Sequence, residues 1–308
     1  LINGGKGDDK LKGDEGNDTL TIYGAGTARG NGGNDTLKAY AISAKLYGGE
    51  GNDKLRSYSG KSKLYGGSGN DDIEAVGLSN NVDGVSGYDN IKVTAASNTV
   101  EGGDGHDYVE AKGGKNTVKG GSGNDTLKAW GLGNKVNGDS GNDRIDVFAA
   151  SNTVDGGDGH DHIVTKGGTN TVRGGTGNDK IFAYGAANII DAGSGNDTVN
   201  AYGGGNVVKS ASGNNVIEAG GLVNVITTGG GNDKITAQGG ANIIRVGNGK
   251  NNVKAGGLGN AVTTGSGDDI VNVLAHSNVV LTAGGNDRVI AGGMYNIIST
   301  GAGNDDVY

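Results

Sequence analysis

Aspartate recurs at every eighteenth position along most of this 308-residue chain, as in Asp107, Asp125 and Asp143. A spacing that is held without slippage places these side chains in one row, with one carboxylate per turn of a repeating coil. Stacked carboxylates repel one another unless a cation lies between them. Carboxylate and carbonyl oxygens are the ligands that Ca²⁺ prefers. The row therefore predicts a series of calcium sites along one edge of a coiled structure.

The elements that position this row follow from a nine-residue pattern inside each period. Residues 120–128 read Gly-Gly-Ser-Gly-Asn-Asp-Thr-Leu-Lys, and residues 129–137 form the second half of the same period. An aliphatic residue recurs every nine positions, which predicts short strands with inward side chains. The Gly, Asn and Asp residues between them predict turns. The aliphatic series includes Leu127, Val136, Ile145, Val154, Ile163, Val172, Ile181 and Ile190.

Two strands and two turns per period predict an all-β fold, a parallel β-roll or β-solenoid of about 17 two-stranded coils, each one 18-residue period long. We expect one repeat domain over residues 1–308, with N-terminal coils at 1–29 and regular repeats at 30–308. The first two nonapeptides follow each other directly, so Asp9 and Asp18 are expected on opposite edges. The Asp18 edge then continues after one coil that is shortened by a single residue.

Composition limits the class of protein. The chain has 67 glycines, no proline and no cysteine, and only 33% of its residues are apolar. A thin aliphatic core does not offset the backbone entropy of so many glycines, so a bound metal is expected to stabilise the fold. No apolar run reaches membrane-spanning length, and the net charge of −8 argues against nucleic-acid binding. No signal peptide begins the chain and its only methionine is Met294, so we expect a piece of a larger protein.

The pattern Gly-Gly-x-Gly-x-Asp-x-aliphatic-x resembles the calcium-binding nonapeptide of repeats-in-toxin (RTX) β-rolls. The resemblance implies that one turn supplies carbonyl groups from its second and fourth positions and the next turn from its first and third. One ion is then expected among Gly103, Gly105 and Asp107 of one turn and Gly120, Ser122 and Asp125 of the next. The carboxylates expected along the whole row are those of Asp18, Asp35, Asp53, Asp71, Asp89, Asp107, Asp125, Asp143, Asp161, Asp179, Asp197, Asp269, Asp287 and Asp305.

The row is interrupted in the C-terminal half of the chain. Asn215 and Asn251 replace aspartate, and Ser210-Ala211 replaces the paired glycines. Each replacement of aspartate removes a carboxylate, so calcium sites between residues 197 and 269 are expected to be vacant or weaker.

The opposite edge carries asparagine with the same spacing. A primary amide both donates and accepts hydrogen bonds, so stacked asparagines can bond along the row without a cation. We therefore expect calcium on one edge and a metal-free asparagine ladder on the other. Its members are Asn80, Asn98, Asn116, Asn134, Asn152, Asn170, Asn188, Asn206, Asn224, Asn242, Asn260, Asn278 and Asn296, with Ser62 and Ala44 in the same phase.

Residues 98–107, Asn-Thr-Val-Glu-Gly-Gly-Asp-Gly-His-Asp, and their neighbours resemble the 18-residue repeats near the C-terminus of multifunctional autoprocessing repeats-in-toxin (MARTX) toxins. The resemblance covers residues 30–308. It implies type I secretion, folding on extracellular Ca²⁺ and a part in contacting or crossing the host plasma membrane, in support of effector delivery. Neighbouring segments of the full-length toxin are further expected partners.

Two other functions fit the same repeats. A calcium-dependent adhesin or ice-binding surface protein is one, but an ice binder needs a regular rank of outward threonines. The third turn position instead varies, with Ser122, Ser140, Asp158 and Thr176. The other is an accessory solenoid attached to an enzyme, which flanking sequence would decide.

Side chains that could support catalysis are few and scattered. His106 and His160 occupy the fifth position of the turn, where an exposed turn residue is expected, and no nucleophile accompanies them in a repeated arrangement. The chain is therefore expected not to be an enzyme, because an enzyme needs a unique, asymmetric site.

Two outward columns could bind partners. The first is aromatic and is expected to pack over glycine turns or to contact glycan or lipid headgroups. It contains Tyr23, Tyr40, Tyr58, Trp130, Phe148, Tyr184 and Tyr202. The second follows the ladder asparagine and changes from polar to aliphatic in the C-terminal half, which predicts an exposed interface with another copy of the chain, a neighbouring segment of the full toxin or a membrane. This aliphatic stripe contains Ile189, Val207, Val225, Ile243, Ala261, Val279 and Ile297.

Overall fold

The computed structural model describes residues 1–58 and 60–308, and these residues form strands and turns without any helix. The chain divides into two compact units, Leu1–Val154 and Asp155–Tyr308. Both are stacks of parallel β-coils, which confirms the predicted all-β solenoid. The prediction of one domain over residues 1–308 stays a prediction.

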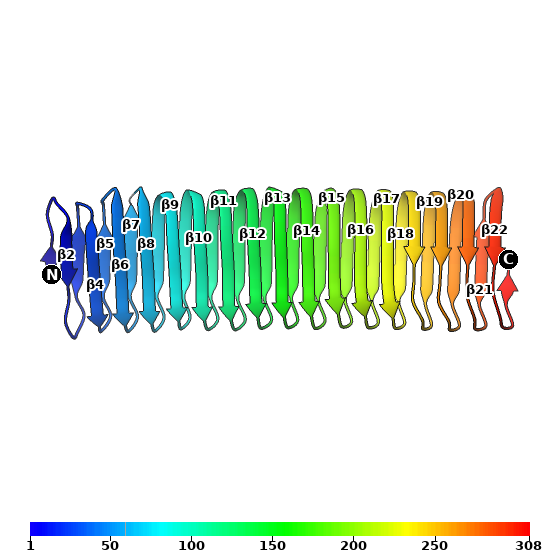
Figure 1. Ribbon diagram of the computed structural model, residues 1–308, viewed down its shortest axis with the longest axis horizontal. Helices are drawn as coiled ribbons and strands as arrows, with labels where there is room; N and C mark the ends of the chain where they lie inside the picture. Colours follow the sequence, from blue (N-terminus) through cyan, green and yellow to red (C-terminus); the bar gives the residue numbers. More distant parts are fainter. Residues whose placement is uncertain (59) are drawn as a thin grey trace. The chain divides into compact units, whose positions relative to one another are not determined.

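In unit 1 (Leu1–Val154) successive coils lie side by side (Figure 1). The strands are β1 (Ile2–Asn3), β2 (Asp9–Lys12), β3 (Thr19–Ile22), β4 (Gly26–Gly32), β5 (Thr36–Ala39), β6 (Ser43–Glu50), β7 (Lys54–Tyr58), β8 (Lys61–Ser68), β9 (Asp72–Ser86), β10 (Asn90–Asp104), β11 (Tyr108–Ser122), β12 (Thr126–Ser140) and β13 (Arg144–Asp158), the last of which continues into unit 2.

Unit 2 (Asp155–Tyr308) repeats this arrangement (Figure 1). Its further strands are β14 (His162–Thr176), β15 (Lys180–Ser194), β16 (Thr198–Ser212), β17 (Val216–Gly230), β18 (Lys234–Arg245), β19 (Asn252–Thr263), β20 (Ile270–Leu281), β21 (Arg288–Gly292), β22 (Tyr295–Ser299) and β23 (Asp306–Val307).

The register of the strands reproduces the sequence period. Val109 of β11 pairs with Leu127 of β12, one period later, and the pairing is parallel. At the N-terminus, Asp9 of β2 pairs with Gly26 of β4, a shift that is one residue less than the period and confirms the shortened coil. Gly26 in turn pairs with Ala44, so Asp9 lies in the column of the asparagine edge, as predicted.

From β9 to β20 each coil is a single strand of 12 or 15 residues, whereas the last complete coil is divided into β21 and β22 of five residues each. The strand bends at the asparagine edge, and the pairing between coils continues through the bend, as in Thr94↔Lys112 and Ser97↔Lys115. From β9 to β20 the two predicted strands of each coil are therefore one bent strand, whereas the first and last coils have two separate strands, as in β5 and β6. The loops between strands lie at the other edge, at the bottom of Figure 1.

The core is a narrow seam of small and branched side chains. In β12, Leu127, Ala129 and Val136 are all buried, so the first half of a coil buries an alanine as well as the predicted aliphatic residue. These three are the only buried apolar side chains of β12. The packing therefore depends on close stacking of the coils as much as on the volume of the core.

The asparagine edge carries an amide ladder in each unit. In unit 1 it runs from Asn80 to Asn134, and the Nδ2 of Asn98 donates to the Oδ1 of Asn116 at 2.8 Å. In unit 2 the series runs from Asn170 to Asn296 with distances of 2.8 to 2.9 Å. The second N–H of Asn116 donates to the Trp130 carbonyl at 2.9 Å. The predicted ladder is confirmed, and its amides satisfy one another without a cation.

Candidate metal centre

The turns at the aspartate edge are held by glycines that no other residue could replace without strain. Gly123, at the fourth position of its nonapeptide, has φ of 122°, in the region that favours glycine. A Cβ atom there would lie 1.8 Å from the carbonyl oxygen of Gly105 in the preceding coil. The carbonyl oxygen of the fourth-position residue, Gly105, is therefore in close contact with the Cα of Gly123, the fourth-position residue of the next coil.

Each aspartate in the row makes the same intercoil hydrogen bond. The backbone N–H of Asp107 donates to the Oδ1 of Asp125 at 2.8 Å, and Asp89 donates to Asp107 in the same way. The bond recurs from Asp18 to Asp143 in unit 1 and from Asp161 to Asp305 in unit 2. One side-chain oxygen per coil, a carboxylate oxygen except at Asn215 and Asn251, therefore joins successive coils without a cation.

The second carboxylate oxygen of many of these aspartates is buried without a hydrogen-bond donor. Their side chains are almost fully buried, with Asp107 and Asp125 only 2% and 1% exposed. A buried charged oxygen without a partner is costly, so it calls for a proton or a cation. The Oδ2 atoms concerned in the row include those of Asp35, Asp53, Asp71, Asp89, Asp107, Asp125, Asp179, Asp233, Asp269 and Asp287.

Where the first turn position is glycine, a carbonyl oxygen of the next coil and the Oδ2 atom lie on the same side of that glycine. A Cβ atom on Gly102, the first position of its nonapeptide, would lie 2.5 Å from the Oδ2 of Asp107 and 2.6 Å from the carbonyl oxygen of Gly120. The absent side chain thus leaves a carboxylate oxygen and a carbonyl oxygen of two successive coils around one point. Two such oxygens without a hydrogen between them are a donor set for a hard cation.

Burial raises the pKa of these carboxyl groups. The pKa of Asp71 and of Asp89 rises to about 7, and that of Asp125 to about 6, because burial disfavours the charged form. The backbone N–H of the preceding aspartate opposes the shift, and the charges of neighbouring aspartates add to it. The pKa of Asp179 likewise rises to about 7 in unit 2.

The six residues of the expected site lie at one junction, by which we mean two successive turns at the aspartate edge. Gly103 and Gly105 precede Asp107 in the first turn, and Gly120 and Ser122 precede Asp125 in the second. The Ser122 carbonyl already accepts the N–H of Gly105 at 2.7 Å, which leaves its second lone pair. The oxygens present fit Ca²⁺, and their assignment as ligands stays a prediction.

Across residues 1–58 and 60–308, no three His, Cys, Asp or Glu side chains gather into a group that could hold a metal. This agrees with one carboxylate per coil, since most ligands of an ion at a junction would be backbone carbonyls. An ion here would therefore hold two coils together rather than complete a side-chain cage.

A second ladder at the fifth turn position was not predicted from the sequence. The backbone N–H of Asn142 donates to the Oδ1 of Asn124 at 2.6 Å. The two histidines at this position do the same, since the Nδ1 of His106 accepts from Asn124 and that of His160 from Asn178. These histidines therefore act as acceptors in the turn. The recurrence of Asn at the fifth turn position is the sequence feature from which this ladder could have been predicted.

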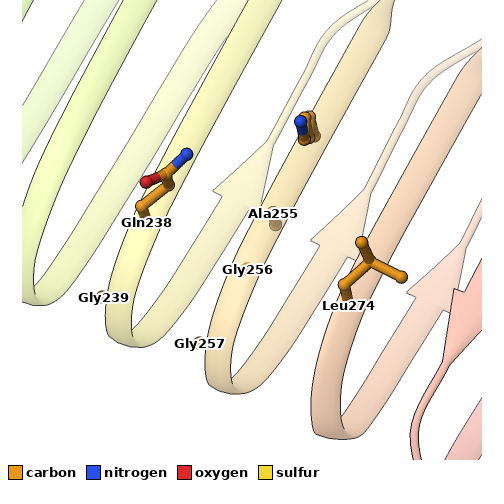
Figure 2. Close-up of a pocket in the computed structure, with 7 residues that line it drawn as sticks. Gln238, Gly239, Ala255, Gly256, Gly257 and Leu274 are labelled. Carbon is orange, nitrogen blue, oxygen red and sulfur yellow. The ribbon is translucent and has the colours of Figure 1, made fainter.

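The aromatic column packs against itself where its members are consecutive. The rings of Trp130 and Phe148 are stacked with their centroids 5.9 Å apart, and those of Tyr184 and Tyr202 are stacked at the same centroid distance. Further along, Gly256 stands between Gln238 and Leu274 in the same column. The missing side chain leaves a shallow depression there, shown in Figure 2. It is lined by Gln238, Gly239, Lys254, Ala255, Gly256, Gly257 and Leu274.

No helix in the described part of the chain is long and apolar enough to cross a membrane. A family model described as the RTX calcium-binding nonapeptide repeat (4 copies) matches most of the sequence. The matched segments are residues 1–21, 22–41, 46–75, 83–118, 93–127, 110–145, 131–163, 164–199, 218–253 and 281–308. No curated protein matches the chain.

Proposed function

Because the chain belongs to the RTX calcium-binding nonapeptide repeat family, we propose that it is the calcium-dependent, non-enzymatic repeat region of a secreted MARTX-type toxin. RTX repeats bind Ca²⁺, are typical of secreted extracellular proteins and usually have a structural role. The observation that carries the proposal is the row of buried Oδ2 atoms without donors. In this proposal the region folds outside the cell, after type I secretion, and supports contact with the host membrane.

Bound Ca²⁺ would supply the positive charge that the aspartate edge lacks. The proposed ligands at one junction are the carbonyl groups of Gly103, Gly105, Gly120 and Ser122 with the carboxylates of Asp107 and Asp125. At the other junctions the proposed carboxylates are those of the aspartate row given under Sequence analysis. Each aspartate keeps its Oδ1 on the N–H of the preceding coil, so the chain itself sets the spacing of the coils. Its Oδ2 is the atom left for the ion.

Calcium should also reverse the charge of the chain. If about 12 ions bind, the net charge changes from −8 to about +16. We therefore expect binding to vesicles of phosphatidylserine and phosphatidylcholine in Ca²⁺ and none in chelator, measured by co-sedimentation. Binding should weaken as salt rises, because screening shortens the range of the attraction. Neutral phosphatidylcholine vesicles are the control. Lipid binding that does not respond to ionic strength would contradict the proposal.

The aliphatic stripe is the surface that we assign to this membrane contact. Its residues are aligned by the register in unit 2, where Val207 pairs with Ile189 and with Val225. Ile189 is 51% exposed and Ile297 is 67% exposed. Val207 is 47% and Ile243 36% exposed, and Val225 between them is half-buried. A partly exposed apolar column of this length is typical of an interaction surface.

Replacing Val207, Val225 and Ile243 together with Thr should preserve the calcium-dependent fold, because these side chains point away from the core. It should weaken vesicle binding by about tenfold or more, since lost apolar burial in lipid costs about 0.8 kcal/mol per CH₂ group. Co-sedimentation measures the effect. The matched control replaces the exposed Leu132, Leu222 and Leu258 with Thr, outside the stripe. Equal binding by the stripe variant and the native chain would sink this assignment.

A further inference from the structure

Two coils carry asparagine where the row has aspartate, and both amides are held in one orientation. Asn215 and Asn251 are as buried as the aspartates, at 1% and 2% exposure. The Oδ1 of Asn215 accepts the backbone N–H of Asp197 at 3.0 Å, and the Oδ1 of Asn251 accepts that of Asp233 at 2.9 Å. Because Oδ1 is the acceptor, the amide nitrogen must lie where an aspartate places its Oδ2.

The amide nitrogen of Asn251 lies among oxygens of two successive coils. It donates to the carbonyl oxygens of Gly247 and Gly249 at 3.1 and 3.2 Å, and to the Oδ1 of Asp269 at 3.0 Å. Gly247 and Gly249 are the second and fourth positions of their turn. This nitrogen therefore satisfies two turn carbonyls of its own coil and a carboxylate of the next.

Asn215 repeats the arrangement two coils earlier. Its amide nitrogen donates to the carbonyl oxygen of Gly213 at 2.9 Å and to the Oδ1 of Asp233 at 3.0 Å. Gly213 is again a fourth-position residue. Two coils with an aspartate coil between them therefore share one hydrogen-bond pattern, which argues for a common role.

Aspartate and asparagine have nearly the same shape but opposite chemistry at this atom. In the aspartate coils the atom is an oxygen without a donor, as for Asp89 and Asp125, and it needs a positive partner. In the asparagine coils this atom is a nitrogen, and its N–H groups donate to the turn carbonyls and to the next carboxylate, which a cation would otherwise contact. We propose that Asn215 and Asn251 are built-in replacements for the cation. The junctions 215/233 and 251/269 then bind no Ca²⁺, and the coils around them stay stacked in its absence.

This proposal rests on calcium binding by the aspartate coils, and it adds that some coils stack only with Ca²⁺ whereas others stack without it. Most of the chain would stack only when the ion binds, whereas β16 would pair with β17, and β18 with β19, without it. A stretch that forms first offers a template on which neighbouring coils can stack as calcium arrives, because adding a coil to an existing one is easier than starting a new stack.

The direct test is Asn251→Asp in the full chain. We expect this variant to bind about one more Ca²⁺ at saturation, measured by equilibrium dialysis, because it restores an oxygen site. In calcium-free buffer, amide hydrogen exchange in β18 and β19 should become faster than in the native chain. The matched control is Asn232→Asp, which makes the same charge change at the exposed fifth position. That position already carries aspartate elsewhere, since Asp268 accepts the N–H of Asn286.

The reverse change, Asp125→Asn, keeps the proposal testable if Asn251→Asp fails to fold. It should bind about one ion fewer and slow amide exchange in β11 and β12 in calcium-free buffer, because an amide then faces the turn carbonyls. The proposal is overturned if Asn251→Asp changes neither the ion count nor exchange in β18 and β19. It is overturned as well if Asp125→Asn leaves exchange as fast as before. A native chain that binds no Ca²⁺ at all would instead overturn the proposed function.

Discussion

In calcium-free buffer we expect the chain to lose most of its β-sheet signal in far-ultraviolet circular dichroism, and to regain it when Ca²⁺ is added. Each coil buries few large side chains, such as Val109 and Val118 in β11. Ordering a whole coil that is rich in glycine costs much conformational entropy. The buried Oδ2 atoms add a further cost unless a cation compensates them. Binding energy and folding energy are therefore coupled. A residual signal from the pairs β16–β17 and β18–β19 is expected in chelator.

A matched pair of variants in one coil separates the proposed ligand from its surroundings. Asp107→Ala removes a buried carboxylate of the row and should shift the calcium midpoint of folding to higher concentration. Asp104→Ala removes the same charge from an exposed position, where the side chain accepts a hydrogen bond from the Ser122 hydroxyl. Its midpoint should stay near that of the native chain. A β-sheet signal unchanged by chelator in the native chain would falsify calcium-dependent folding.

Much of the fold could be predicted because one rule repeats. The period determines the register, as in the pairing of Asn98 with Asn116, and the residue type at each column determines which face it occupies. The amide ladder followed from the chemistry of a stacked primary amide. The shortened N-terminal coil was also predictable, since Asp35 follows Asp18 after 17 residues, whereas Asp53 follows Asp35 after 18.

The parts that could not be predicted depend on atoms rather than on residue types. A row of aspartates does not reveal that one oxygen of each carboxylate accepts an N–H and that the other does not. For the same reason Asn215 and Asn251 read as lost ligands, whereas their amide nitrogens occupy the place of the missing charge. The bend at the asparagine edge also has no signal of its own, because the intercoil pairing continues through it.

The second large effect is an opposite response to pH with and without calcium. Folding raises the pKa of Asp71, Asp89 and Asp179 to about 7, above the ordinary value of 3.8. A raised pKa means that the folded coil binds the proton more tightly than the unfolded chain does. This stabilisation is fully present below pH 3.8 and is lost as the pH rises through about 7. In calcium-free buffer the chain should therefore be more stable at about pH 5 than at about pH 7.5.

Saturating Ca²⁺ should reverse that slope, because the ion and the proton compete for the same oxygens. The fraction of β-sheet signal that remains at each pH in buffer freed of calcium by resin measures the first slope, and thermal unfolding in excess Ca²⁺ measures the second, both by circular dichroism. Asp179→Asn is the matched control: its amide cannot titrate, so its stability in calcium-free buffer should fall less as the pH rises. At neutral pH it should exceed that of the native chain by about 1–3 kcal/mol, the cost of a buried unsatisfied group. Stability in calcium-free buffer that rises between about pH 5 and 7.5 would show that neither proton nor cation is needed at the aspartate edge.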